Sequence, residues 1–201
     1  MERVVLAPGT AWQNASERAA EVLRRGGIAL LPAEGVYGLH ALADHGGAVA
    51  RLLGLKPRGA GKRFIGLIGE PGDLDRWAAP SPKALALARE HWPGALTLVV
   101  PASPSIPESL RAPEGTVALR CPGSPFLRAV VRAVGGIVLS TSANKSGDEP
   151  PVRAEDALAD RVDLVVDQGE LSGVPSTVVL VEGDRVHVLR EGGVRLTGRS
   201  T

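Results

Sequence analysis

The apolar residues of this chain recur at two spacings, and the two spacings predict alternating helices and strands. Residues 12–25 carry an apolar side chain every three to four positions and end at a pair of glycines, which is typical of an amphipathic helix. Further segments with this helical pattern lie at 44–54, 82–91, 124–134 and 153–160. Short apolar runs typical of buried strands lie at 28–31, 65–68, 96–100, 117–119, 137–139 and 164–166. This alternation predicts an α/β sheet with flanking helices.

Residues with strong capping preferences stand at several predicted helix ends. Asp44 is expected to be the N-cap of one helix, and Ser124 the N-cap of another, with Pro125 at its first helical position. Gly135 follows the last apolar position of that second helix and is expected to end it.

The C-terminal part of the chain has the pattern of a β-hairpin. Two apolar runs, 177–181 and 185–189, flank the short glycine-bearing turn 182–184, as expected of antiparallel strands. The sheet is therefore predicted to be mixed. Segments 101–115 and 145–153 are rich in polar residues and proline, and we expect both to be surface loops.

Length and composition predict one domain, residues 1–201, in an ordinary water-soluble protein. The chain is 44% apolar and 22% charged, and no apolar run approaches the roughly 20 residues that span a bilayer. A single cysteine, Cys121, cannot form an internal disulfide, and the N-terminus lacks the features of a signal peptide. We therefore expect a cytoplasmic protein that does not associate with a membrane.

The charge balance excludes a strong overall attraction to nucleic acid but leaves room for a local basic patch. Lys and Arg number 23 against 22 acidic residues, for a net charge of +1. Four scattered histidines and one cysteine do not form a metal-binding pattern, so no metal site built by the protein is expected. Neither a Walker phosphate loop nor a nucleophile elbow occurs, which argues against Walker-type NTPases and serine hydrolases.

Two short segments collect the residue types that bind anions. Segment 54–63 holds four cations and three glycines, so Arg58, Lys56 and Lys62 could cradle phosphates; a solvated basic loop is the alternative. Segment 139–147 holds four hydroxyls, an amide and a cation after an apolar strand, where open α/β sheets bind ligands; a hydroxyl-rich turn is the alternative.

Two arginines and the cysteine stand at the ends of predicted strands. Arg120 could hold a carboxylate or form a surface ion pair, and Arg190 has the same two interpretations. Cys121 has no histidine near it in the sequence, so we expect a small buried residue rather than a nucleophile.

Six short motifs together resemble the successive signatures of the YrdC-type threonylcarbamoyl-adenylate synthases. They cover almost the whole chain, from about residue 15 to 195, and match the family in order and spacing. The motifs are 31–39, Lys56-Pro57-Arg58 with Lys62, 91–98, 117–122, 142–147, and 175–179 with Leu189-Arg190. The chain is similar to the short, single-domain type of this family.

The resemblance implies an α/β fold, a YrdC-like twisted mixed sheet with flanking helices and a basic concave face. It also implies a nucleotidyltransferase that joins L-threonine, bicarbonate and ATP into threonylcarbamoyl-AMP and pyrophosphate, for modification of adenosine 37 in tRNA. ATP is then a substrate that carries Mg²⁺ with it. tRNA or double-stranded RNA, and the proteins that transfer the threonylcarbamoyl group to tRNA, are the implied candidate partners.

The same resemblance assigns roles to individual residues. The catalytic pairs of the family fall on Lys56, Arg58, Ser142 and Asn144. The residues implied to contact ATP are Arg58, Lys62, Thr116, Asn144 and Arg190. Those implied to hold threonine are Arg120, Ser142 and Ser176. The reaction requires no protein nucleophile, because a carbamate oxygen of the substrate attacks the α-phosphate, so catalysis is expected to consist of positioning and charge neutralisation.

Three positions depart from the family pattern. Ala33 and Gly35 replace two threonines of many members, and Leu67 replaces a histidine. Gly35 and Leu67 fall on the amino-acid side of the implied site, which predicts weaker discrimination against serine and valine. Two other functions stay open from the sequence: a non-catalytic RNA-binding protein of the same fold, and an enzyme that adenylates another carbamoyl donor.

Overall fold

A mixed β-sheet forms the centre of the computed structural model, which describes residues 1–7, 11–55, 64–145, 147–155, 157 and 161–196. The strands within these ranges are β1 (Glu2–Val5), β2 (Ala29–Ala33), β3 (Val36–Leu42), β4 (Ile65–Leu67), β5 (Leu96–Pro101), β6 (Thr116–Arg120), β7 (Val138–Ser142), β8 (Leu164–Asp167), β9 (Thr177–Glu182) and β10 (Arg185–Arg190). The helices are α1 (Gln13–Arg24), α2 (Gly46–Leu55), α3 (Leu74–Trp77), α4 (Pro82–His91) and α5 (Pro125–Val134), with a 3₁₀ turn at Pro71–Asp73.

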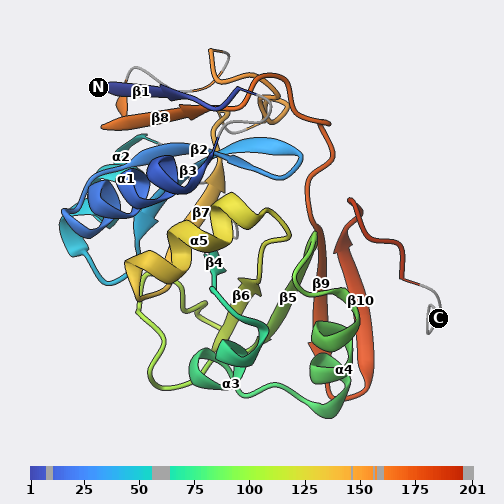
Figure 1. The fold of residues 1–201 in the computed structure, drawn as a ribbon. Coiled ribbons are helices and arrows are strands. Elements are labelled where there is room, and N and C mark those ends of the chain that lie inside the picture. Colours follow the sequence, from blue (N-terminus) through green and yellow to red (C-terminus); the bar gives the residue numbers. More distant parts are fainter. Residues whose placement is uncertain (8–10, 56–63, 146, 156, 158–160, 197–201) are drawn as a thin grey trace.

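The ten strands follow the order β1-β8-β2-β3-β7-β4-β6-β5-β9-β10. Strands β1, β8 and β2 are parallel, β2, β3, β7 and β4 alternate in direction, and the β9–β10 hairpin closes the other edge. Parallel pairs β4–β6 and β5–β9 flank the antiparallel pair β5–β6. In Figure 1, β1 and β8 run horizontally, whereas β9 and β10 at the other edge of the sheet run vertically. The sheet is therefore strongly twisted. The predicted mixed α/β sheet is confirmed.

Each face of the sheet carries its own apolar core, because successive side chains of a strand point to opposite faces. In β2, Leu31 belongs to the cluster under α1 and α5, whereas Leu30 belongs to the cluster on the opposite face. Helices α1 and α5 lie side by side over the first face in Figure 1. The two helices therefore cover only part of that face.

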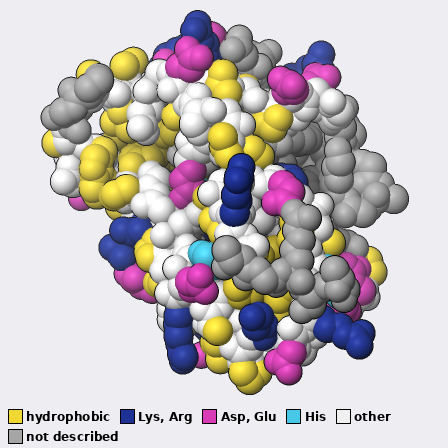
Figure 2. All heavy atoms as spheres, turned by 90° about the vertical axis from the view of Figure 1, so that its right-hand side faces the viewer, with side chains coloured by type: hydrophobic (Ala, Val, Ile, Leu, Met, Phe, Trp, Pro, Cys, Tyr) yellow, Lys and Arg dark blue, Asp and Glu magenta, His cyan; other side chains and the backbone are white. Residues whose placement is uncertain are grey.

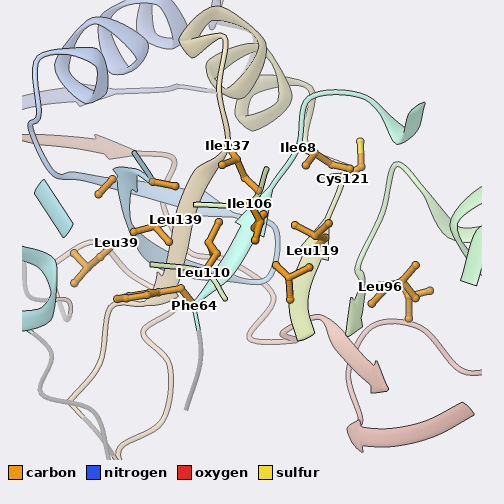
Figure 3. Packing of buried hydrophobic residues seen from close by; sticks show 14 of the residues in the cluster. Leu39, Phe64, Ile68, Leu96, Ile106, Leu110, Leu119, Cys121, Ile137 and Leu139 are labelled. Carbon is orange, nitrogen blue, oxygen red and sulfur yellow. The ribbon is translucent and has the colours of Figure 1, made fainter. Parts of the chain in front are cut away.

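The segment between β5 and β6 was expected to be a surface loop, but it contributes to the core. Ile106 and Leu110 are both almost fully buried. Figure 3 shows them packed beside Phe64, Leu119 and Leu139. These two apolar residues anchor a polar, proline-rich segment in the core.

Most predicted helix ends are confirmed, and one is wrong. Ser124 caps α5 by accepting a hydrogen bond from the Leu127 amide, and Gly135 ends the helix with a φ of 75°. The α2 helix begins at Gly46, so Asp44 is not its N-cap. The imidazole of His45 accepts the Ala48 amide hydrogen bond at 3.2 Å and takes the role expected of Asp44.

Strands β1 and β3 were not predicted, and one predicted helix is not found where the structure describes the chain. Gly38 and His40 interrupt the apolar run of β3, which hides its strand pattern. Residues 153–155 do not form a helix, and part of the predicted 153–160 helix lies outside the described residues. No helix in the described ranges has the length and apolar character required to cross a membrane.

Candidate active site

The β2–β3 hairpin brings a glutamate to the open end of the sheet. Ala33 pairs with Val36, so the turn between the two strands consists of Glu34 and Gly35. Glu34 has a φ of +64°, the left-handed region, and is the one non-glycine residue with this conformation among the described residues. Such a backbone conformation costs about 1–3 kcal/mol unless the residue is glycine, and it is concentrated at functional sites.

The Glu34 carboxylate lies against the start of α5. Its Oε1 accepts hydrogen bonds from the backbone amides of Gly123 and Ser124. Its Oε2 is buried and accepts no hydrogen bond, although it lies 3.3 Å from Nη1 of Arg120. Oε1 of Glu34 therefore anchors the side chain to the start of α5, and Oε2 faces the guanidinium of Arg120.

Arg120 ends β6 and carries a buried positive charge. The residue is 4% exposed, and its Nε has no hydrogen-bond partner. Burial lowers the pKa of Arg120, and the Glu34 carboxylate opposes that shift. A buried ion pair with unsatisfied hydrogen-bonding groups on both partners contributes little to stability, which points to a binding role.

A second cluster joins strands β5, β9 and β10 beside Arg120. Ser176 and Thr97 are buried and their hydroxyls lie 2.9 Å apart. Arg190 donates to the Ser176 carbonyl from Nε at 3.0 Å and from Nη2 at 2.7 Å, and Nη2 also reaches the Ser176 hydroxyl at 3.0 Å. Burial, then the positive charge of Arg120, lower the pKa of Arg190. The two arginines therefore interact electrostatically and form one cationic region.

His40 adds a buried neutral group near the same arginine. It is fully buried, and its Nε2 lies 3.2 Å from the Ser140 hydroxyl. Burial, followed by the charge of Arg120, lowers the pKa of His40 to about 3. The imidazole is therefore uncharged at neutral pH.

Residues 173–175 form a strap across the β2–β3 turn. The Gly173 amide donates to the Gly35 carbonyl at 2.8 Å. A Cβ at Gly35 would lie within 3.0 Å of the backbone N, C and O of Val174. The position where many relatives carry a threonine side chain is thus filled by the strap, so Gly35 does not leave an open space.

The second polar segment of the sequence forms a compact turn after β7. The Ser142 hydroxyl donates to Oδ1 of Asn144 at 2.6 Å, and Nδ2 of Asn144 donates to the Asp148 carbonyl at 2.6 Å. The Ala143 amide is hydrogen-bonded to the Tyr37 carbonyl, which ties the turn to β3. Ser142 and Asn144 are therefore held together as a pair.

The remaining predicted site residues are placed differently. Thr116 begins β6 and lies about 13 Å along that strand from Arg120, with its hydroxyl 3.3 Å from Glu114. Lys56, Arg58 and Lys62 lie outside the described residues. The structure thus brings Arg120, Ser176 and Arg190 together, and it separates Thr116 from Arg120.

Leu67 and Cys121, two residues at or beside strand ends, are both fully buried. Leu67 pairs with Arg120 across β4 and β6 and is fully buried in the core under α1 and α5. Cys121 is fully buried, as expected, and burial raises the pKa of its thiol to about 12. A thiol with this pKa is a poor nucleophile at neutral pH.

The sequence did not single out Glu34, Thr97 or His40 as site residues. Glu34 precedes a glycine between two apolar runs, which indicates a hairpin turn but not which residue takes the positive φ. The signal that was available is the position of a charged residue in a two-residue turn. Its partner Arg120 is 86 residues away, so only the folded chain joins them.

The distribution of surface charge does not reveal a basic patch on the face drawn in Figure 2. Lys and Arg side chains stand beside Asp and Glu side chains there. The basic concave face therefore stays a prediction. Among the described residues, no group of three or more His, Cys, Asp and Glu side chains could hold a metal ion.

Comparison with known families adds a decisive observation. Residues 21–192 match the family Sua5/YciO/YrdC, which is described as telomere recombination. The chain belongs to the Sua5/YciO/YrdC family. The threonylcarbamoyl-AMP synthase of Bacillus subtilis is 36% identical over 183 residues, covering 88% of this chain and 53% of the relative. That of Halorhodospira halophila is 35% identical over 180 residues, covering 88% and 93%.

Solved structures of this family share the fold along nearly the entire chain. The crystal structure of P. abyssi Sua5 complexed with L-threonine has a TM-score of 0.88 at 30% identity, covering 96% of this chain and 58% of that one. E. coli YciO has a TM-score of 0.87 at 26% identity, covering 96% of both chains. This chain spans about half the length of the Bacillus relative and almost the full length of YciO.

Proposed function

We propose that this chain synthesises L-threonylcarbamoyl-AMP and pyrophosphate from L-threonine, bicarbonate and ATP, in the pathway that modifies adenosine 37 of tRNA. The observation that carries the proposal is the 35–38% identity to threonylcarbamoyl-AMP synthases over 88% of the chain. The adjoining clusters supply positive charge for a carboxylate and a triphosphate, from the buried Arg120 and from Arg190, which is exposed on β10.

In this proposal, amino acid and nucleotide bind on either side of Ser176. Arg120 takes the threonine carboxylate, with Ser142 and Ser176 as further partners. Arg190 contacts ATP together with Arg58, Lys62, Thr116 and Asn144. Because Arg190 also donates to the Ser176 hydroxyl and carbonyl, the nucleotide and amino-acid ligands are linked through one hydrogen-bond network.

The reaction proceeds without a covalent enzyme intermediate. Threonine and bicarbonate form a carbamate, whose oxygen attacks the α-phosphate of ATP and expels pyrophosphate. The chain contributes orientation and positive charge from Lys56, Arg58, Lys62 and Arg190, while Mg²⁺ enters with ATP and neutralises phosphate oxygens. The buried Cys121 thiol takes no part.

Pyrophosphate release is the test of this function. The purified chain is incubated with ATP, Mg²⁺, bicarbonate and threonine, and each component is omitted in turn. Release that requires all the substrates supports the proposal, and absence of release with every amino acid overturns it. If no pyrophosphate is released, two parallel measurements separate the alternative functions. Binding of double-stranded RNA or tRNA would identify an RNA-binding protein. Pyrophosphate release with another carbamoyl donor would identify an enzyme that adenylates that donor.

The role of the basic segment is tested by calorimetry. Arg58→Ala is expected to remove most ATP binding without unfolding the protein. Arg24→Ala, on the last turn of α1, is the matched control and should bind ATP like the parent. Unchanged ATP affinity in Arg58→Ala would show that the segment is only a solvated loop.

A further inference from the structure

We propose that Glu34 holds the α-amine of the amino-acid substrate, as the acidic counterpart of Arg120 in recognising a zwitterion. This inference rests on the proposed function and adds a substrate-binding residue to it. Three observations carry it: the strained conformation of Glu34, its unused oxygen, and the unused donor of Arg120 next to it.

The backbone strain indicates that the side chain of Glu34 matters more than its turn. A two-residue hairpin turn with a positive φ at its first position favours glycine there. This chain has glycine available at the second position, Gly35, and still places glutamate at the first. A residue retained in an unfavourable conformation is expected where its functional group is required.

The two oxygens of the Glu34 carboxylate have different environments. Oε1 is satisfied by the amides of Gly123 and Ser124, which fixes the direction of the side chain. Oε2 is buried without a hydrogen bond, 3.3 Å from Nη1 of Arg120. If the carboxylate served only the start of α5, a buried second oxygen without a donor would be an avoidable cost.

Arg120 has a hydrogen-bond donor without an acceptor. Its side chain is 5% exposed, and its Nε lacks an acceptor. Glu34 and Arg120 thus offer one unused acceptor and one unused donor within a single buried ion pair. An α-amino acid carries an anionic acceptor and a cationic donor on the same carbon, so a single zwitterion satisfies both groups at once.

This placement also suits the chemistry of the reaction. Carbamate formation converts the substrate ammonium and bicarbonate into carbamate, water and a proton that goes to solvent. The carbamate nitrogen keeps one N–H, which continues to donate to Oε2 of Glu34. Repulsion between the carboxylate and the new carbamate oxygens directs those oxygens away from Glu34.

The structural alternative is that Glu34 only orients Arg120. The two roles differ in one measurable respect, because orientation of Arg120 affects any carboxylate ligand, whereas an amine contact affects only ligands with an amine. Titration calorimetry in the presence of α,β-methylene ATP therefore compares L-threonine with 3-hydroxybutyrate, the same molecule with hydrogen in place of the amine.

Glu34→Gln keeps an oxygen for the Gly123 and Ser124 amides and removes the charge. We expect it to weaken threonine binding by roughly tenfold to a hundredfold, as for other charge-assisted hydrogen bonds, and to change 3-hydroxybutyrate binding by less than about twofold. Glu34→Gly is a second variant, in which glycine relieves the strain of the positive φ and so offsets part of the lost side-chain contacts. It should show the same selective loss.

The controls separate this assignment from the proposed function. Glu70→Gln removes the surface ion pair with Arg132 and should leave both ligands unaffected. Equal loss of threonine and 3-hydroxybutyrate, or no loss of either, overturns the amine contact while the parent enzyme stays active. A parent protein that binds ATP but no amino acid overturns the proposed function, and this assignment with it.

Discussion

Replacing Gly35 with alanine should disturb both the stability of the protein and its affinity for threonine. The added Cβ would lie within 3.0 Å of three backbone atoms of Val174, and backbone cannot rotate out of the way as a flexible side chain can. The strap must then retreat by roughly an ångström or more to reach ordinary van der Waals contact.

The strap is anchored on both sides, so its retreat breaks specific interactions. Gly173 donates to Gly35, Gly193 donates to the Pro175 carbonyl, and Arg190 holds the carbonyl of Ser176. Overpacking costs about 1–3 kcal/mol and a lost hydrogen bond about 1 kcal/mol, which gives a total of roughly 2–4 kcal/mol. For a domain of this size, that corresponds to a fall in Tm of about 5–15 °C.

The functional effect follows from the displacement of Ser176, the neighbour of the strap. We expect KM for threonine to rise roughly tenfold, with a smaller change in KM for ATP. Differential scanning calorimetry and the pyrophosphate assay measure the two effects. Gly46→Ala is the control: nothing lies within 4 Å of its added Cβ at the start of α2, so it should change stability by less than about 1 kcal/mol and leave KM for threonine unchanged.

If Gly35→Ala has the stability and threonine KM of the parent, the close approach of the strap does not constrain the site. The backbone of the strap already lies where a side chain at position 35 would stand, and Leu67 is fully buried in the core under α1 and α5.

Three further predictions concern single residues. Asn144→Ala should weaken ATP binding at least tenfold in calorimetry, and its lost hydrogen bonds to Ser142 and Asp148 should lower stability by only about 1 kcal/mol; a large fall in Tm with normal ATP affinity would contradict a role in binding. The pKa of His40 falls from 6.5 to about 3 on folding, so the unfolded chain binds the proton more tightly and stability falls as pH decreases below about 6.5. Between pH 7 and 5 this contribution is of order 2 kcal/mol, and chemical denaturation of His40→Gln should show a correspondingly smaller loss; an equal loss would contradict it. Cys121, buried and with a pKa of about 12, should resist iodoacetamide at pH 8 until the protein is unfolded, and rapid alkylation of the native protein would refute its burial.

Local patterns in the sequence were sufficient to predict most of the elements. The helices α1, α4 and α5 and the β9–β10 hairpin follow from apolar spacing together with proline and glycine at their ends. These signals depend on residues a few positions apart, and the physics of a helical turn or a tight hairpin acts over the same distance. The family motifs could likewise be found in the sequence, because four of the six are short uninterrupted strings.

Contacts between distant parts of the chain could not be predicted from such local patterns. Strand β1 joins the sheet by pairing with β8, about 160 residues later, and its four residues give no alternation long enough to distinguish a strand. The segment 101–115 is rich in polar residues and was expected at the surface, yet Ile106 and Leu110 pack into the core. In both cases the deciding interaction comes from a distant part of the chain.

The sequence by itself determined the α/β class, the family and the chemical types of residue available for the reaction. Only the tertiary structure decided which of them meet: Glu34 with Arg120, Ser176 with Arg190, and Gly35 with the strap at Val174. The positive φ of Glu34 is likewise a tertiary property, because the contacts with Arg120 and the start of α5 must offset its local cost. Burial then keeps His40 uncharged and leaves atoms of Glu34 and Arg120 without hydrogen bonds, because both effects depend on excluding water, which no local pattern specifies.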